Sequence, residues 1–159
     1  WHLEELEPVV RKTLDVLIDR GLIYRDADSE SLKPAPLNTA EALQLSVIAR
    51  SALQALERYY VTVALLMKHG PGVLTQPKLE ELCHLMAQRI SMLYQLNAPE
   101  FFDRRLFRGF IGHLRHYGVI TVGEDSRIEF GDALRRADSD ARTMLGESLR
   151  HNILQAVYL

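Results

Sequence analysis

The sequence is poor in the features that mark several large classes of protein. Its 159 residues include one cysteine, so no internal disulfide can form and the fold does not need an oxidising compartment. The longest apolar run, from Tyr59 to Met67, is far shorter than the ~20 residues that span a bilayer. The net charge is −2, so attraction to nucleic acid or to a membrane must come from a local patch.

Proline and glycine are also scarce, at six and nine residues, while 47% of the residues are hydrophobic. This composition excludes collagen-like, low-complexity and wholly disordered chains, and the length suits one ordinary domain. No signal peptide opens the sequence, which starts at Trp1 within an amphipathic pattern. We therefore expect it to be a piece of something longer.

Apolar residues recur at three- and four-residue steps over most of the chain, which predicts amphipathic helices. We expect these helices at residues 3–20, 38–68, 75–93, 104–117 and 132–159, the last interrupted at Gly146. Asn38 with Glu41 is typical of a capping box, and Asp103 is the expected cap of the fourth helix. The expected buried faces of the third and fourth helices are Leu79, Leu82, Met86, Ile90 and Leu93, and Leu106, Phe107, Phe110, Ile111 and Leu114.

Short β segments interrupt the helices. Residues 119–122 and 127–130 predict a hairpin, and residues 22–24 a strand followed by a polar connection over 26–36. A helix, a glycine stop (Gly21, Gly118), a β segment and an acidic turn occur twice, at a constant offset of 97 residues. We predict a mainly α fold: a single helical domain over residues 1–159 with one or two short β-hairpins in winged-helix-like units. Chance similarity is the alternative explanation of the repeat.

The sequence shows no recognisable active site. His113 and His116 share a helix face, but no further ligands at zinc-site spacing accompany them, so surface histidines near a helix end are the better interpretation. Cys83 lies inside a predicted helix without any nucleophile signature, which is typical of a buried structural cysteine. We therefore assign no catalytic, cofactor-binding or metal-binding residue, and we expect no cofactor.

The fourth predicted helix carries the sharpest local charge. Four arginines and no acid lie between Asp103 and Glu124, namely Arg104, Arg105, Arg108 and Arg115. One interpretation is a solvated face whose arginines pair with nearby acids such as Asp103 or Glu100. A second is contact with an anionic surface, either lipid headgroups or an acidic carrier protein. A third is nucleic acid, because a basic helix followed by a hairpin is typical of winged-helix readers, although the acidic hairpin would repel phosphates.

One stretch of the sequence is specific enough to indicate a family. Residues 86–103 end in Asn97-Ala98-Pro99-Glu100-Phe101-Phe102-Asp103, and they are accompanied by Leu56-Glu57-Arg58-Tyr59-Tyr60 and Gly118-Val119-Ile120. This set resembles the carboxy-terminal region of bacterial membrane-bound glycerol-3-phosphate acyltransferases. The resemblance covers most of the chain from Leu43 to Ile120 and is looser on either side.

The resemblance implies an enzyme that transfers a fatty acyl group from acyl-acyl carrier protein (acyl-ACP) or acyl-coenzyme A to glycerol 3-phosphate, in phospholipid synthesis at the cytoplasmic face of the inner membrane. In this family a histidine acts as base, and an aspartate five positions later orients it. None of the six histidines here has an aspartate at that position. The resemblance therefore implies a non-catalytic C-terminal domain, with the catalytic residues upstream of Trp1.

The partners implied are the catalytic domain of the same protein, the acyl donor through the whole enzyme, and an anionic membrane surface at which the protein is peripheral. Aromatic side chains are our candidates for packing between domains: Tyr59, Tyr60, Phe101 and Phe102. The alternative function is a winged-helix-like nucleic-acid-binding module that uses the four arginines.

Overall fold

The structure is a computed structural model that describes residues 3–26, 29, 31–94, 99–145 and 147–158. The chain divides into two compact units, Trp1–Ala52 (unit 1) and Leu53–Leu159 (unit 2), which are described separately below. Helix α2 (Ala40–His69) contributes residues to both units. None of the helices in the described ranges has the length and apolarity needed to cross a bilayer.

Unit 1 consists of one helix, a hairpin and the start of α2. Its elements are α1 (Leu3–Asp19), β1 (Ile23–Arg25), β2 (Leu32–Pro34) and the first residues of α2. After α1 the chain turns through Gly21 at φ +68°, a left-handed conformation that favours glycine. The two strands are antiparallel, with Ile23 opposite Pro34. The buried apolar side chains described in this unit are Leu22 and Ala35, so unit 1 has very little core of its own.

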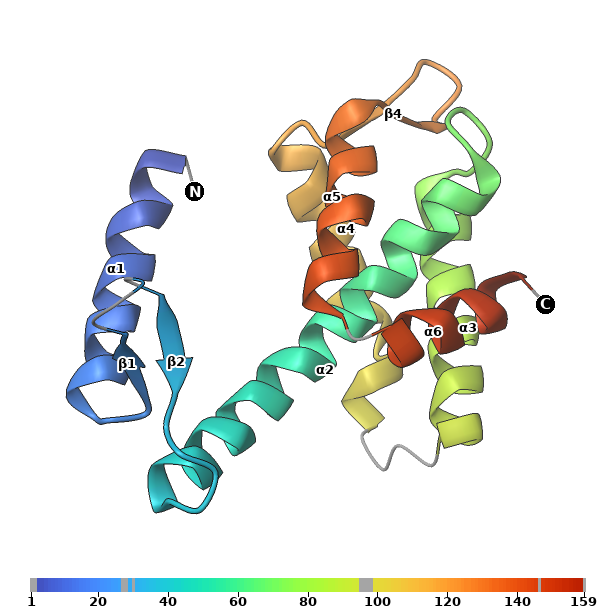
Figure 1. The fold of residues 1–159 in the computed structure, drawn as a ribbon. Helices are drawn as coiled ribbons and strands as arrows, with labels where there is room; N and C mark the ends of the chain where they lie inside the picture. The colour runs from blue at the N-terminus through green and yellow to red at the C-terminus, as the bar shows by residue number, and fades with distance from the viewer. Residues whose placement is uncertain (1–2, 27–28, 30, 95–98, 146, 159) are drawn as a thin grey trace. The chain divides into compact units, whose positions relative to one another are not determined.

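Unit 2, whose helices and strands are drawn in Figure 1, holds nearly all of the buried apolar residues among those described. Its elements are the rest of α2, α3 (Gln76–Tyr94), the 3-10 helix η1 (Pro99–Phe102), α4 (Arg104–His116), β3 (Ile120–Val122), β4 (Ile128–Phe130), α5 (Asp132–Met144) and α6 (Glu147–Tyr158). Every side chain of α2 from Tyr60 to Leu66 is buried, because the other helices of the unit cover that stretch on all sides.

The hairpin of unit 2 is extended by a third backbone segment. The Gly72 N–H donates to the Ile128 carbonyl at 2.9 Å, and the Ile128 N–H donates to the Leu74 carbonyl at 2.8 Å. The order of elements is therefore helix (α2), extended segment (72–75), two helices (α3, α4) and hairpin (β3, β4). The predicted mainly α class with short hairpins is confirmed, and unit 2 has a winged-helix-like order of elements whose third segment (72–75) was not predicted from the sequence.

Several details differ from the sequence prediction. Strand β2 lies within the stretch expected to be a connection. The cap of α2 is Thr39 rather than Asn38, since the Ala42 N–H donates to the Thr39 hydroxyl at 3.2 Å. Leu93 is 61% exposed and Leu106 36% exposed, so neither lies on a buried face. Gly146, Asn97 and Ala98 lie outside the described residues, and the single domain over 1–159 stays a prediction.

Candidate functional site

The basic face predicted from the sequence is the outer side of α4. Asp103 caps this helix, and its carboxylate accepts a hydrogen bond from the Arg105 N–H at 2.9 Å. Phe107, Ile111 and Leu114 turn inward and are buried in the core of unit 2. The outer side of the helix is exposed and includes the four arginines that sequence reasoning singled out: Arg104, Arg105, Arg108 and Arg115.

Arg105 is held by the cap residue of its own helix. Its guanidinium donates to both carboxylate oxygens of Asp103, at 2.8 to 3.2 Å. The hydrogen bonds from the Arg105 side chain have the largest effect, and the one from its backbone N–H the next largest. Together they hold the pKa of Asp103 below its usual value. The positive charge of Arg105 therefore faces solvent already paired with a negative one.

Arg108 pairs with a carboxylate from another helix. Its Nε and one terminal nitrogen each lie 3.0 Å from Oε2 of Glu80 on α3, while Gln76 donates to Oε1 at 3.0 Å. Burial alone would raise the pKa of Glu80, but the hydrogen bonds from Arg108 and Gln76 outweigh it, and the pKa lies below its usual value. This pair ties α3 to α4.

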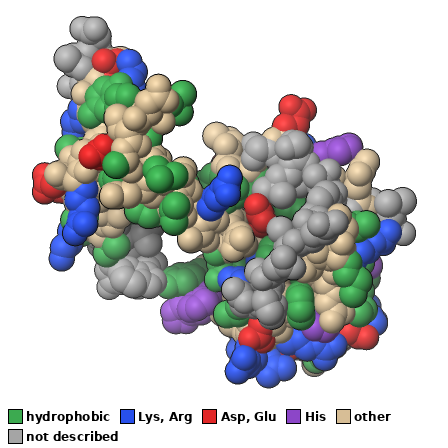
Figure 2. Space-filling view, turned by 90° about the horizontal axis from the view of Figure 1, so that it is seen from below, with side chains coloured by type: hydrophobic (Ala, Val, Ile, Leu, Met, Phe, Trp, Pro, Cys, Tyr) green, Lys and Arg blue, Asp and Glu red, His purple; other side chains and the backbone are tan. Residues whose placement is uncertain are grey.

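Arg104 and Arg115 are the more available charges. Neither makes an ion pair in the part of the chain that the structure describes, although Arg104 lies within electrostatic reach of Glu80 and Glu81. In the face drawn in Figure 2, blue Lys and Arg side chains lie beside red acidic ones. Because Arg105 and Arg108 pair with Asp103 and Glu80, about half of the arginine charge on the outer side of α4 is already matched.

The two histidines of α4 both contact one tyrosine. His113 stacks on Tyr117, with ring centroids 6.4 Å apart, and His116 meets the same ring edge-on at 5.0 Å. Within the described ranges, no group of three or more His, Cys, Asp or Glu side chains could hold a metal ion. The sulfur of Cys83 is fully buried against the Thr62 hydroxyl, and burial raises the pKa of this thiol to about 12.

The four aromatic residues expected at an interface take different positions. Tyr60 and Phe101 are only 3% and 2% exposed and pack within unit 2, where the Tyr60 hydroxyl donates to Asp138 at 3.0 Å. Tyr59 is half-buried and stacks on Phe110, with centroids 4.3 Å apart. Phe102 is half-buried, and its carbonyl contacts the His84 ring at 2.6 Å. Packing between domains stays a prediction, and the half-buried pair offers the accessible ring surface.

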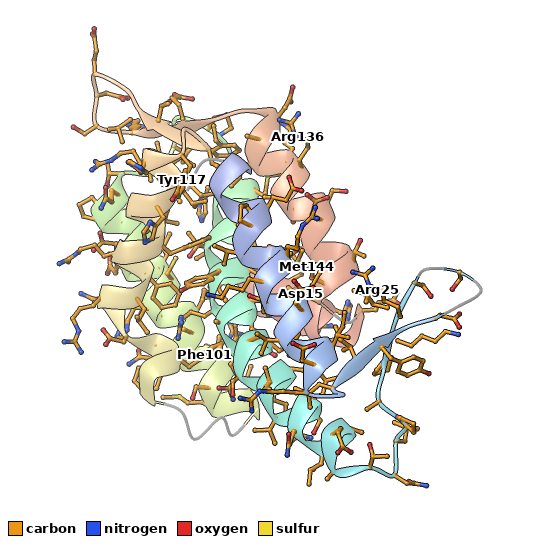
Figure 3. The ribbon with its side chains drawn as sticks, turned by 90° about the vertical axis from the view of Figure 1, so that its left-hand side faces the viewer. Asp15, Arg25, Phe101, Tyr117, Arg136 and Met144 are labelled. Atoms are coloured by element: carbon orange, nitrogen blue, oxygen red, sulfur yellow. The ribbon has the colours of Figure 1, made fainter. Side chains whose placement is uncertain are left out.

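A pocket between α2 and α5 was not foreseen from the sequence. It has a volume of about 270 Å³. Its walls are mainly apolar and are formed by Leu56, Tyr59, Tyr60, Val63, Ala137, Asp140, Ala141, Met144 and Leu145. Figure 3 labels Met144, which is 64% exposed, on α5. Hydrophobic periodicity predicts the buried face of each helix on its own. It cannot show that a pocket remains between two packed helices.

A buried carboxylate was also missed. Glu57 lies on α2 within the stretch that the sequence marks as family-like, and it is only 9% exposed. Burial raises the pKa of this carboxyl group above its usual value, because the charged form is poorly solvated there. Nothing in the local sequence distinguishes Glu57 from the exposed acids of other amphipathic helices.

The fold and the surface of α4 define the chain as a helical, winged-helix-like module with a mixed basic face. The family model for the glycerol-3-phosphate acyltransferase C-terminal region matches residues 1–123. The chain therefore belongs to this family, which confirms the resemblance seen in the sequence. No solved structure matches the chain.

Curated relatives agree with the family match. The chain is 39% identical over 156 residues to glycerol-3-phosphate acyltransferase of Xylella fastidiosa (strain 9a5c), covering 96% of this chain and 18% of the relative. It is 40% identical over 155 residues to that of Xanthomonas axonopodis pv. citri (strain 306), with the same coverage. It is 38% identical over 156 residues to that of Pseudomonas aeruginosa (strain UCBPP-PA14), covering 98% of this chain and 18% of the relative. The chain thus spans less than a fifth of these relatives, and nothing in the comparisons supports the nucleic-acid alternative.

Proposed function

We propose that this chain is the non-catalytic C-terminal region of an enzyme that transfers a fatty acyl group from acyl-ACP or acyl-coenzyme A to glycerol 3-phosphate. The observation that carries the proposal is the family match over residues 1–123, together with relatives of that name. A second observation supports the non-catalytic role. No histidine in the 159 residues has an aspartate five positions on, so the base and its orienting acid come from elsewhere in the protein.

The test compares the 159-residue chain with the full-length protein in one acyl-transfer assay. Radiolabelled glycerol 3-phosphate is offered with acyl-ACP or with acyl-coenzyme A, and the lipid-extractable product is counted. We expect product with the full-length protein and none above background with the chain alone. Transfer by the chain alone would contradict its non-catalytic role. A full-length protein inactive with both donors would contradict the proposed activity.

We further propose that the outer face of α4 contacts anionic lipid headgroups at the cytoplasmic face of the membrane, with the protein peripheral there. The exposure of Arg104 and Arg115, without an ion pair in the described part of the chain, supports this role. Arg105 and Arg108 contribute less, because Asp103 and Glu80 already match their charges. A basic residue near an anionic leaflet contributes about 1 kcal/mol of binding.

Vesicle binding separates these contributions. Replacing Arg115 with Gln should weaken binding of the full-length protein to phosphatidylglycerol vesicles by about fivefold, and adding Arg104→Gln should weaken it by about fivefold again. Arg105→Gln is the matched control, and we expect a change below about twofold because this charge is already paired. Equal losses of vesicle binding for Arg105→Gln and Arg115→Gln would contradict the proposal that Arg104 and Arg115 contribute most of the lipid contact. Binding to duplex DNA or to carrier protein, with no response to anionic lipid, would contradict the lipid contact.

A further inference from the structure

The two units repeat one backbone pattern at the offset of 97 residues. In unit 1 the Gly21 N–H donates to the Ile18 carbonyl at 2.8 Å, and the Leu22 N–H to the Leu17 carbonyl at 2.9 Å. In unit 2 the corresponding bonds run from Gly118 to Arg115 at 3.1 Å and from Val119 to Leu114 at 2.9 Å.

The repeat extends to the ends of the elements and to the backbone conformation. Helices α1 and α4 end at Asp19 and His116, and strands β1 and β3 begin at Ile23 and Ile120. The two glycines have φ values of +68° and +67°. The helix, glycine stop and hairpin seen twice in the sequence are therefore present twice in the structure, with the same local backbone geometry.

Corresponding side chains of the two copies differ sharply in their exposure to solvent. Phe107 is 0% exposed in unit 2, whereas its counterpart in unit 1, Val10, is 47% exposed. By the pairing of each hairpin, Leu32 on β2 corresponds to Ile128 on β4. Ile128 is 1% exposed, and Leu32 is 42% exposed. The face of unit 1 that carries Val10 and Leu32 (the open face) thus corresponds to a core face of unit 2.

In unit 2 the covering elements are known. Phe107 and Ile128 lie in the core that α2 and α3 contribute to, with Leu66 and Leu79 among its fully buried members. The extended segment 72–75, which joins α2 to α3, also pairs with the backbone of Ile128. In the described part of unit 1, no segment pairs with the outer edge of β2 at Leu32. Unit 1 therefore corresponds to the second half of a winged-helix-like unit.

We propose that the open face of unit 1 is covered by a helix–strand–helix segment of the same full-length protein, equivalent to the second part of α2, segment 72–75 and α3. This inference rests on the proposed function in one respect, that the chain is a region of a longer acyltransferase. With that segment in place, the protein contains two winged-helix-like units in tandem, and their assembly joins this region to the rest of the enzyme.

The chemistry of the open face favours a protein segment over other occupants. Leu32 offers unpaired strand backbone as well as an apolar side chain, and a lipid layer supplies no backbone donors or acceptors to such an edge. A second copy of this chain is a poor source, because its own α2, segment 72–75 and α3 are already used inside its unit 2. The relatives have more than four-fifths of their length outside the matched region, which leaves ample chain to supply the segment.

Cysteine labelling with a matched control tests the proposal. Val10→Cys and Val16→Cys place thiols at two sites of α1 that are 47% and 45% exposed. Their counterparts in unit 2 differ, since Phe107 is buried and His113 is exposed. The native Cys83 is fully buried, with a pKa of about 12, and so contributes little background.

In the isolated 159-residue chain we expect both variants to react with a maleimide at similar rates. In the full-length protein we expect V10C to slow by at least about tenfold while V16C changes by less than about twofold, because closure of a folded unit blocks only the buried site. Amide exchange at Leu32 provides a measurement without substitution. The Leu32 N–H should be protected in the full-length protein and exchange freely in the isolated chain.

Three results would overturn the proposal. Unchanged V10C labelling in the full-length protein would show that nothing covers the open face. Protection of V10C in the monomeric isolated chain would assign the cover to this chain itself, and protection that grows with chain concentration would assign it to a second copy. Labelling does not depend on acyl transfer. A full-length protein that protects V10C but transfers no acyl group contradicts the proposed function alone, and an active one with reactive V10C contradicts this inference alone.

Discussion

The ion pair between Arg108 and Glu80 matches one of the four arginine charges on the outer face of α4, and its coupling energy can be measured. Two guanidinium nitrogens lie 3.0 Å from the same carboxylate oxygen, with 65% of the Arg108 side chain exposed and 10% of the Glu80 side chain exposed. Fully exposed pairs contribute about 0.2–1 kcal/mol, and hydrogen bonds to charged groups about 1.5–3 kcal/mol. Because Arg108 is largely exposed while Glu80 is largely buried, we expect about 1 kcal/mol of coupling at neutral pH.

The assay is a double-mutant cycle with Arg108→Gln, Glu80→Gln and both together, followed by urea unfolding of the 159-residue chain. The pKa of Glu80 is lowered in the folded state, so its stabilisation is present above the ordinary carboxyl pKa and is lost as the pH falls through the lowered value. Arg115→Gln is the control, and we expect its change in unfolding free energy to stay below about 0.5 kcal/mol. Coupling near zero at pH 7, or coupling that persists unchanged in acid, would refute this reasoning.

Two further predictions concern stability. Phe107→Ala should destabilise the chain by about 3–5 kcal/mol because the side chain is fully buried, whereas Val10→Ala should change the unfolding free energy of the isolated chain by less than about 0.5 kcal/mol. If urea unfolding showed similar losses of unfolding free energy for the two variants, the conclusion that Phe107 is buried and Val10 is exposed in the isolated chain would be wrong. Glu57→Gln should raise the melting temperature at pH 7, because burial raises the pKa of this carboxyl group and so makes its charged form costly. The gain should shrink as the pH falls through the raised pKa, since both states then carry a neutral side chain, and a gain that grows in acid would show the opposite sign.

Local chemistry made much of the fold predictable. Gly21 and Gly118 end their helices at positive φ, and Asp103 caps α4, because each of these choices depends on a few neighbouring residues. The family could also be predicted, because the motif around Phe101 and Phe102 is defined by the identity of its residues and does not depend on how they pack.

Packing between distant segments was not predictable. The burial of Cys83 was predicted, but Leu93 was wrongly expected to be buried, and the buried face of α3 instead includes Ala87, whose small side chain carries little hydrophobic signal. The partner of Arg108 is Glu80, 28 positions earlier, and no local rule connects them. The open face of unit 1 was invisible for the same reason: Val10 fits a buried stripe as well as Phe107 does, and only coordinates show that one is covered.

The way each hairpin is completed also sets an order for biosynthesis. Strands β1 and β2 join neighbouring stretches of chain, so their pairing closes a short loop soon after both have left the ribosome. The Leu74–Ile128 contact joins residues separated by α3 and α4, so the sheet of unit 2 cannot be completed until both helices have been synthesised. The two-stranded sheet of unit 1 is therefore completed early in the synthesis of this region, and the three-segment sheet of unit 2 is completed late.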